Sequence, residues 1–170
     1  PPPPPPPPPT HPHPPPPTPT QFPYTTLFRS NLMNLQKYQE ALRYFKNAIE
    51  IGEQYGFYNN LSDIYISLVD LYTELNQYEE AEQAGQQAIK YANLVDNDFL
   101  LMRSWLAMGR LNLFQGKYNE AIDLLKHSLD VATPDFGDKF FLSKVHYRLG
   151  KAYRGSHNYK DAIVSFDIYD

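Results

Sequence analysis

From residue 31 onward, apolar residues recur every three or four positions, the spacing of one face of an α-helix. The first clear face comprises Leu61, Ile64, Tyr65, Leu68, Tyr72 and Leu75. Two later faces follow the same spacing: Leu101, Trp105, Met108 and Asn112, and then Leu142, His146, Leu149 and Tyr153. The pattern predicts an all-α fold.

A short pattern, Tyr followed three positions later by Ala, occurs four times. The alanines are Ala41, Ala81, Ala121 and Ala162, which are 40, 40 and 41 residues apart. Small residues one and two turns downstream of these alanines let a second helix approach the first closely. Each unit is therefore predicted to be an antiparallel pair of helices.

The turn within each pair is predicted by one residue, which stands two positions before the Tyr of the Tyr-x-x-Ala pattern. Asn76, Gly116 and His157 occupy this place. A residue with a left-handed backbone commonly follows the end of a helix; Gly suits this conformation best, and Asn and His tolerate it.

These motifs resemble the tetratricopeptide repeat, and the resemblance covers residues 31–170. It is carried by Trp105-x-x-Met108-Gly109, Gly116-x-Tyr118-x-x-Ala121, Leu149-Gly150-x-x-Tyr153 and Tyr159-x-x-Ala162. The spacing of about 40 residues resembles the long-helix variety of this repeat. The resemblance implies a right-handed α-solenoid of antiparallel helix pairs.

The predicted units are a partial one at 31–56, two near-complete ones at 57–96 and 97–137, and a truncated one at 138–170. Solenoids need polar capping units at their ends, and none is visible, so we expect a fragment of a longer array. Gly85 stands where the family usually has a large aromatic residue. We expect it to leave the second pair under-packed and to cost about 1 kcal/mol of helix propensity.

Residues 1–30 have a different composition, with 16 of the 17 prolines in the first 23 residues. A polyproline II ligand of an SH3-type domain and a solvated, disordered tail are two possible interpretations. We favour a third, because Phe22–Ser30 resembles the translation of a sequencing-library adapter and the prolines a homopolymer read. This segment, with His11 and His13, is therefore excluded from functional reasoning, and the natural N-terminus is expected to be absent.

Composition excludes several functions. The chain has a net charge of −4 and lacks the clustered basic residues that are typical of a nucleic-acid-binding protein. There is no cysteine, no apolar run long enough to span a membrane, and no catalytic or metal-binding motif around His127, His146 or His157. We therefore predict a non-enzymatic protein without cofactor or metal. The compartment stays open, with the cytoplasm favoured.

The resemblance implies a peptide-binding groove along the first helix of each pair. We predict nine groove residues. Offsets from Trp105 place eight of them along these helices: Arg103, Leu106, Arg110, Phe114, Lys144, Tyr147, Lys151 and Arg154; Arg148 stands beside them. The groove runs from acidic to basic along the array, so we predict a protein or peptide partner that bears an acidic segment. In the alternative interpretation, Asp63 and Asp70 pair with Arg103 and Arg110 on the adjacent helix.

Two functions follow from the resemblance. The first is a protein- or peptide-binding scaffold. The second is the sensory or regulatory input segment of a bacterial signalling protein, such as a histidine kinase or a diguanylate cyclase. A chaperone-type carboxylate clamp is rejected, because only Lys144 and Arg148 match its five residues.

Overall fold

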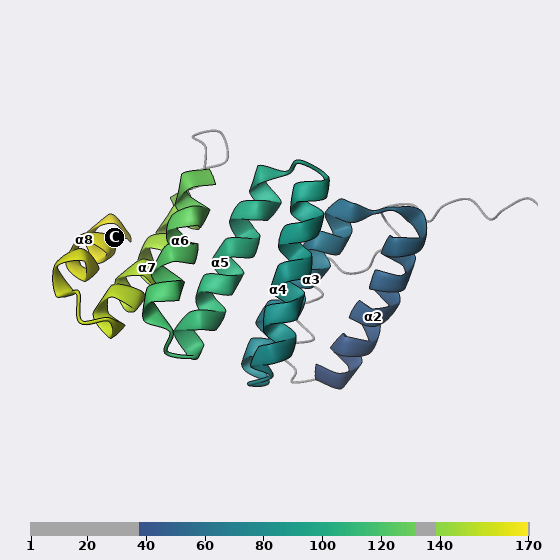
Figure 1. Cartoon of the computed structure of the whole chain (residues 1–170), viewed down its shortest axis with the longest axis horizontal. Coiled ribbons are helices and arrows are strands. Elements are labelled where there is room, and N and C mark those ends of the chain that lie inside the picture. The colour runs from purple at the N-terminus through teal and green to yellow at the C-terminus, as the bar shows by residue number, and fades with distance from the viewer. Residues whose placement is uncertain (1–37, 132–138, 170) are drawn as a thin grey trace, which may run out of the picture.

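The computed structural model describes residues 38–131 and 139–169, and every element in them is a helix. The helices are α2 (Tyr38–Tyr55), α3 (Tyr58–Glu74), α4 (Tyr78–Leu94), α5 (Asp98–Phe114), α6 (Tyr118–Val131), α7 (Lys139–Gly155) and α8 (Tyr159–Tyr169). Figure 1 shows them following one another along the long axis of the molecule, with α2 and α8 at its two ends. The predicted all-α solenoid is confirmed. The interpretations of residues 1–30 lie outside the described residues.

Consecutive helices pack as the antiparallel pairs α3–α4, α5–α6 and α7–α8. The first helices of successive pairs also contact one another, α3 with α5 and α5 with α7. Among the described helices, no two second helices are packed to that extent. The layer of first helices is therefore the crowded, inner side of the array, and the layer of second helices is the outer side.

The turns follow the predicted backbone conformation. Asn76, Gly116 and His157 have φ of 58°, 72° and 63°, which confirms the left-handed turn residue within each pair. The next N–H closes each turn by bonding back to the helix, as in Gln77 N to Tyr72 O at 2.9 Å. Gly56 and Asp96 repeat this geometry between pairs.

Close packing depends on small residues at the helix contacts. Ala48, Ala81, Ala88 and Ala121 are buried with essentially no exposed surface. The under-packing expected beside Gly85 is wrong, because Met108 of α5 fills this space. A Cβ at residue 85 would lie 1.9 Å from Met108 Sδ. The side chain of the following unit thus replaces the missing aromatic ring.

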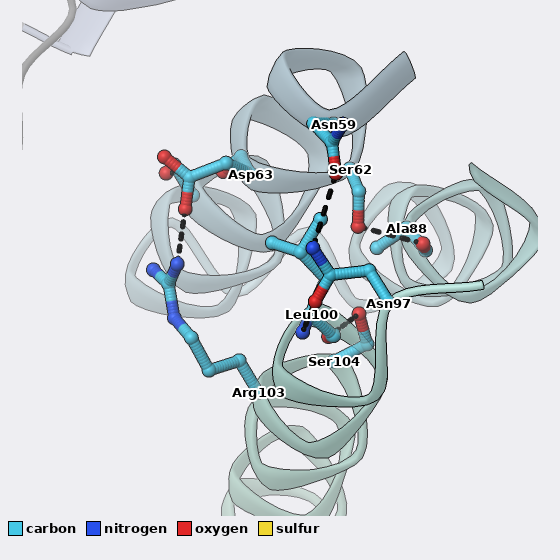
Figure 2. A network of polar contacts seen from close by, with 9 residues as sticks. Asn59, Ser62, Asp63, Ala88, Asn97, Leu100, Arg103 and Ser104 are labelled. Atoms are coloured by element: carbon cyan, nitrogen blue, oxygen red, sulfur yellow. Dashed lines mark hydrogen bonds and ion pairs between the residues drawn. The ribbon is translucent and has the colours of Figure 1, made fainter. Parts of the chain in front are cut away.

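Buried serines tie the two helices of a pair together. Ser62 Oγ of α3 donates to the carbonyl oxygen of Ala88 on α4, at 2.9 Å (Figure 2). In the next pair the direction is reversed, since Ser128 Oγ of α6 donates to the carbonyl oxygen of Met102 on α5, also at 2.9 Å.

None of the helices within 38–131 and 139–169 combines the length and apolar composition of a membrane span.

Candidate functional site

Two salt bridges between α3 and α5 lie at the N-terminal end of the inner face. Arg103 Nη1 lies 2.5 Å from Asp63 Oδ1 (Figure 2), and Arg110 Nη1 lies 2.6 Å from Asp70 Oδ1. Arg110 also pairs with Glu74. Burial alone would lower the pKa of Arg110, but the two carboxylates outweigh it and the pKa is raised. The intramolecular pairing therefore holds at both predicted positions.

On α7, the positions equivalent to Arg103 and Arg110 also carry positive charge. Lys144 and Lys151 stand 41 residues after Arg103 and Arg110, so the positions that carry arginine on α5 carry lysine on α7. Lys144 Nζ lies 4.1 Å from the centroid of the Phe140 ring, and Lys151 Nζ lies 4.7 Å from that of Tyr147. Among the described residues, neither lysine has a carboxylate partner.

Arg148 is the most deeply placed cation of this face. Its Nη1 donates to the carbonyl oxygen of Leu106 on α5, at 3.1 Å. Burial lowers the pKa of the guanidinium; Asp70 opposes this effect and Arg110 adds to it. The group nevertheless stays charged at neutral pH. An Arg side chain that enters the α5–α7 contact without a carboxylate partner in direct contact is a costly arrangement.

A cleft of about 600 Å³ lies between α5 and α7. Its lining is Arg110, Leu113, Phe114, Tyr118, Tyr147, Arg148, Lys151, Arg154 and Gly155. Four of these residues are cations and none is an acid. Phe114 is 52% exposed and Tyr147 is 39% exposed, so aromatic surface is available beside the charge. Such a cleft can bind an anionic group and pack against the apolar residues that flank it.

Six of the nine predicted groove residues line this one cleft: Arg110, Phe114, Tyr147, Arg148, Lys151 and Arg154. Arg103 and Lys144 lie outside it. The expectation for Leu106 needs correction, because its side chain is only 7% exposed. It packs in the core with Leu125, Val145 and Leu149, so it contributes its backbone carbonyl and not an apolar floor.

Tyr118 belongs to the cleft and was not among the predicted groove residues. Its ring lies so close to Gly155 that a Cβ at residue 155 would be 2.3 Å from Tyr118 Cε1. The glycine at 155, where α5 has Phe114, was the sequence signal for this contact. The tyrosine that opens α6 thus forms one wall of the cleft.

The three described histidines, His127, His146 and His157, do not form a reactive cluster. His146 on α7 is the equivalent of Trp105 on α5. Its buried Nδ1 has no hydrogen-bond partner among the described residues. Burial lowers the pKa of this imidazole. Trp105 instead packs on His127, with ring centroids 5.5 Å apart. No group of three or more potential metal ligands occurs in the described ranges.

A larger cleft, of about 880 Å³, lies between α2 and α4 on the outer side of α3. Its charged lining is mixed: Glu50, Glu53 and Glu80 face Lys46 and Lys90. Tyr91 donates to Glu53 Oε1 at 3.3 Å, which occupies one of these carboxylates. This mixed cleft selects no sign of charge, so the α5–α7 cleft is the better candidate site.

Comparisons with known proteins agree with the repeat. A family profile described as "Tetratricopeptide repeat" matches residues 30–93 and 100–166. No curated protein sequence matches the chain. Among solved structures, the crystal structure of BtubC (BKLC) from P. vanneervenii is similar, with a TM-score of 0.73 at 17% identity. The match covers 84% of this chain and 59% of that chain, and at this identity it concerns the fold alone.

Proposed function

Since this chain belongs to the tetratricopeptide repeat family, whose repeats generally serve as protein-interaction modules, we propose that it is a non-catalytic scaffold that binds an acidic segment of a partner protein. The site is the cleft between α5 and α7. The acidic segment lies along the inner face, beside Phe114 and Tyr147.

One observation carries this proposal: the cleft is lined by four cations and by no acid. Between α3 and α5 the equivalent positions neutralise each other, Asp63 with Arg103 and Asp70 with Arg110. On the α7 side of the cleft, Arg148, Lys151 and Arg154 have no carboxylate contact among the described residues, and Arg110 repels Arg148. An anion in the cleft would relieve this excess of positive charge. An acidic segment supplies that anion.

The aromatic side chains give the segment a place to pack. Phe114 and Tyr147 keep 52% and 39% of their surface exposed at the edge of the cleft. Partly exposed aromatic residues next to Arg are typical of the energetically dominant part of a protein interface. The favoured partner segment therefore combines acidic with apolar residues.

The sensory or regulatory input segment of a bacterial signalling protein stays a prediction, and no described residue favours it over the scaffold. Both functions use a partner-binding inner face. The proposal concerns that face, and it holds whether the bound segment belongs to another protein or to an output domain.

The proposal is tested by selection from a random peptide library on the immobilised chain, followed by affinity measurements on the enriched peptides. We expect enriched peptides to be acidic and to contain apolar residues. The double variant Lys151→Glu/Arg154→Glu is expected to lose most of that binding. Lys46→Glu/Lys90→Glu on the outer face is the matched control, because it makes the same change of charge away from the cleft.

Two results would contradict the proposal. One is enrichment of basic or uncharged peptides. The other is equal loss of binding in the inner-face and outer-face variants, which would mean that net charge, and not the cleft, governs binding. Circular dichroism on each variant establishes that the helices are retained.

A further inference from the structure

The charge in the α5–α7 cleft is more concentrated than a single carboxylate would balance. Arg110 is already paired with Asp70 and Glu74. Arg148, Lys151 and Arg154 have no carboxylate contact among the described residues. Three uncompensated cations therefore lie along one wall of the cleft.

These three cations follow one another on α7 at steps of three residues. Side chains three apart on a helix are neighbours, with roughly 5–6 Å between their Cβ atoms. The whole of α7, KFFLSKVHYRLGKAYRG, contains no Asp or Glu that would compete for them. One compact anion can therefore contact two of these cations at once.

Arg148 adds a geometric requirement. One of its N–H groups bonds to Leu106 O at 3.1 Å, while a guanidinium has five N–H donors in a planar fork. The remaining donors suit an acceptor group that presents two oxygens side by side. Because the side chain is recessed between α5 and α7, that acceptor has to stand at the tip of a projecting side chain.

We propose that the anion recognised in this cleft is a phosphorylated side chain of the partner protein. A phosphate monoester carries about −1.5 to −2 charge at neutral pH and has three strong acceptor oxygens. It can contact the fork of Arg148 with two oxygens and Lys151 with the third. A carboxylate carries one negative charge and has two oxygens, so it balances fewer of the cations. This inference rests on the proposed function, because it concerns the same cleft.

The surroundings accommodate the phosphorylated residue and its neighbours. The cleft holds about 600 Å³, and Leu113, Phe114 and Tyr147 offer apolar surface next to Arg148 and Lys151. Apolar residues before and after the phosphorylated side chain would pack there. The expected recognition element is therefore a phosphorylated residue with apolar flanks.

Three peptide libraries test the inference on the full chain. They share randomised flanks and differ in one fixed central residue: serine, phosphoserine or aspartate. We expect the phosphoserine library to bind about tenfold more tightly than the aspartate library, because the third phosphate oxygen adds a charge-assisted contact to Lys151. The serine library is expected to bind most weakly.

Two substitutions of Arg148 separate charge from geometry. Arg148→Gln is expected to abolish the preference for phosphoserine, and Arg148→Lys, which keeps the charge without the fork, is expected to lose most of it. Lys160→Gln on α8 is the control, since this exposed lysine lies outside the cleft and should leave the preference unchanged. Thermal unfolding of each variant establishes that the fold is kept.

The outcomes distinguish the two proposals. Equal binding of the phosphoserine and aspartate libraries, both above serine, overturns the phosphate inference and leaves the acidic-segment scaffold standing. Binding of neither library above serine overturns both. A phosphoserine preference that survives Arg148→Gln also overturns the inference, because the recognising group would then lie elsewhere.

Discussion

Arg148 on α7 donates a hydrogen bond to the backbone carbonyl of Leu106 on α5, at 3.1 Å, and so crosses the contact between two successive first helices. The bond anchors a guanidinium that has no carboxylate in direct contact among the described residues. A partly buried cation whose direct hydrogen bond goes to a neutral carbonyl suits ligand binding better than it suits stability.

Arg148→Met is therefore expected to change the free energy of unfolding by less than about 1 kcal/mol. The lost hydrogen bond and the lost attraction to Asp70 are offset by removal of a desolvated charge and of its repulsion from Arg110. Urea denaturation followed by circular dichroism measures the change.

Ser128→Ala provides a comparison for the Arg148 variant, because it removes a buried hydrogen bond of ordinary strength and should cost about 1 kcal/mol. If Arg148→Met costs more than about 3 kcal/mol, the range for a broken buried ion pair, Arg148 is a structural residue and not a binding one.

The pair of Asp70 and Arg110 is expected to contribute modestly to stability. Their side chains are 37% and 21% exposed, so solvent screens the attraction. A double-mutant cycle with Asp70→Asn and Arg110→Met should give a coupling free energy of about 0.5–1 kcal/mol, and less at high salt. A coupling near zero would mean that Glu74 alone holds Arg110.

The substitution Gly85→Ala is expected to change stability in opposite directions, depending on whether Met108 is present or replaced by Ala. In the natural background Gly85→Ala gains about 1 kcal/mol of helix propensity. The overlap with Met108 costs about 1–3 kcal/mol and should make the net change destabilising.

When Met108 is first replaced by Ala, the overlap disappears and Gly85→Ala should stabilise the protein. Both effects are measured by urea denaturation of the four variants of the cycle. Stabilisation in both backgrounds would show that the Met108 side chain moves aside at a cost smaller than the gain in helix propensity.

His146 is expected to make the protein sensitive to acid. Burial lowers the pKa of its imidazole in the folded chain. The unfolded chain then binds a proton first, below about pH 6.5, so the free energy of unfolding falls as the pH drops through that value.

His146→Gln should reduce the loss of stability on acidification. Thermal unfolding of the wild type and the variant between about pH 8 and pH 5 measures the difference. If the wild type and the variant lose stability in parallel over this range, burial of His146 is not the cause.

The helix pairs could be predicted from sequence because each depends on local information. The Tyr-x-x-Ala pattern marks the start of a second helix, and Asn76 and His157 have the left-handed backbone that their side chains tolerate. Small residues at fixed offsets identify the faces that approach closely.

Contacts between units were harder to predict, because they depend on side-chain direction. Met108 reaches Gly85 across 23 positions of the chain, and no local pattern contains that contact. Leu106 falls in a groove column by offset, yet its side chain turns into the core. Arg148 was placed beside the groove by offset, but its bond to a backbone carbonyl could not be read from residue types.

The central claim, that an acidic segment binds between α5 and α7, is tested most directly by amide chemical-shift mapping. An acidic peptide with apolar residues, selected as described above, is titrated into isotope-labelled protein. The account predicts that the largest shift changes fall in 106–118 and 147–155, the segments that form the cleft. Shift changes that gather instead on α2 and α4, or that spread evenly over the helices, would contradict it.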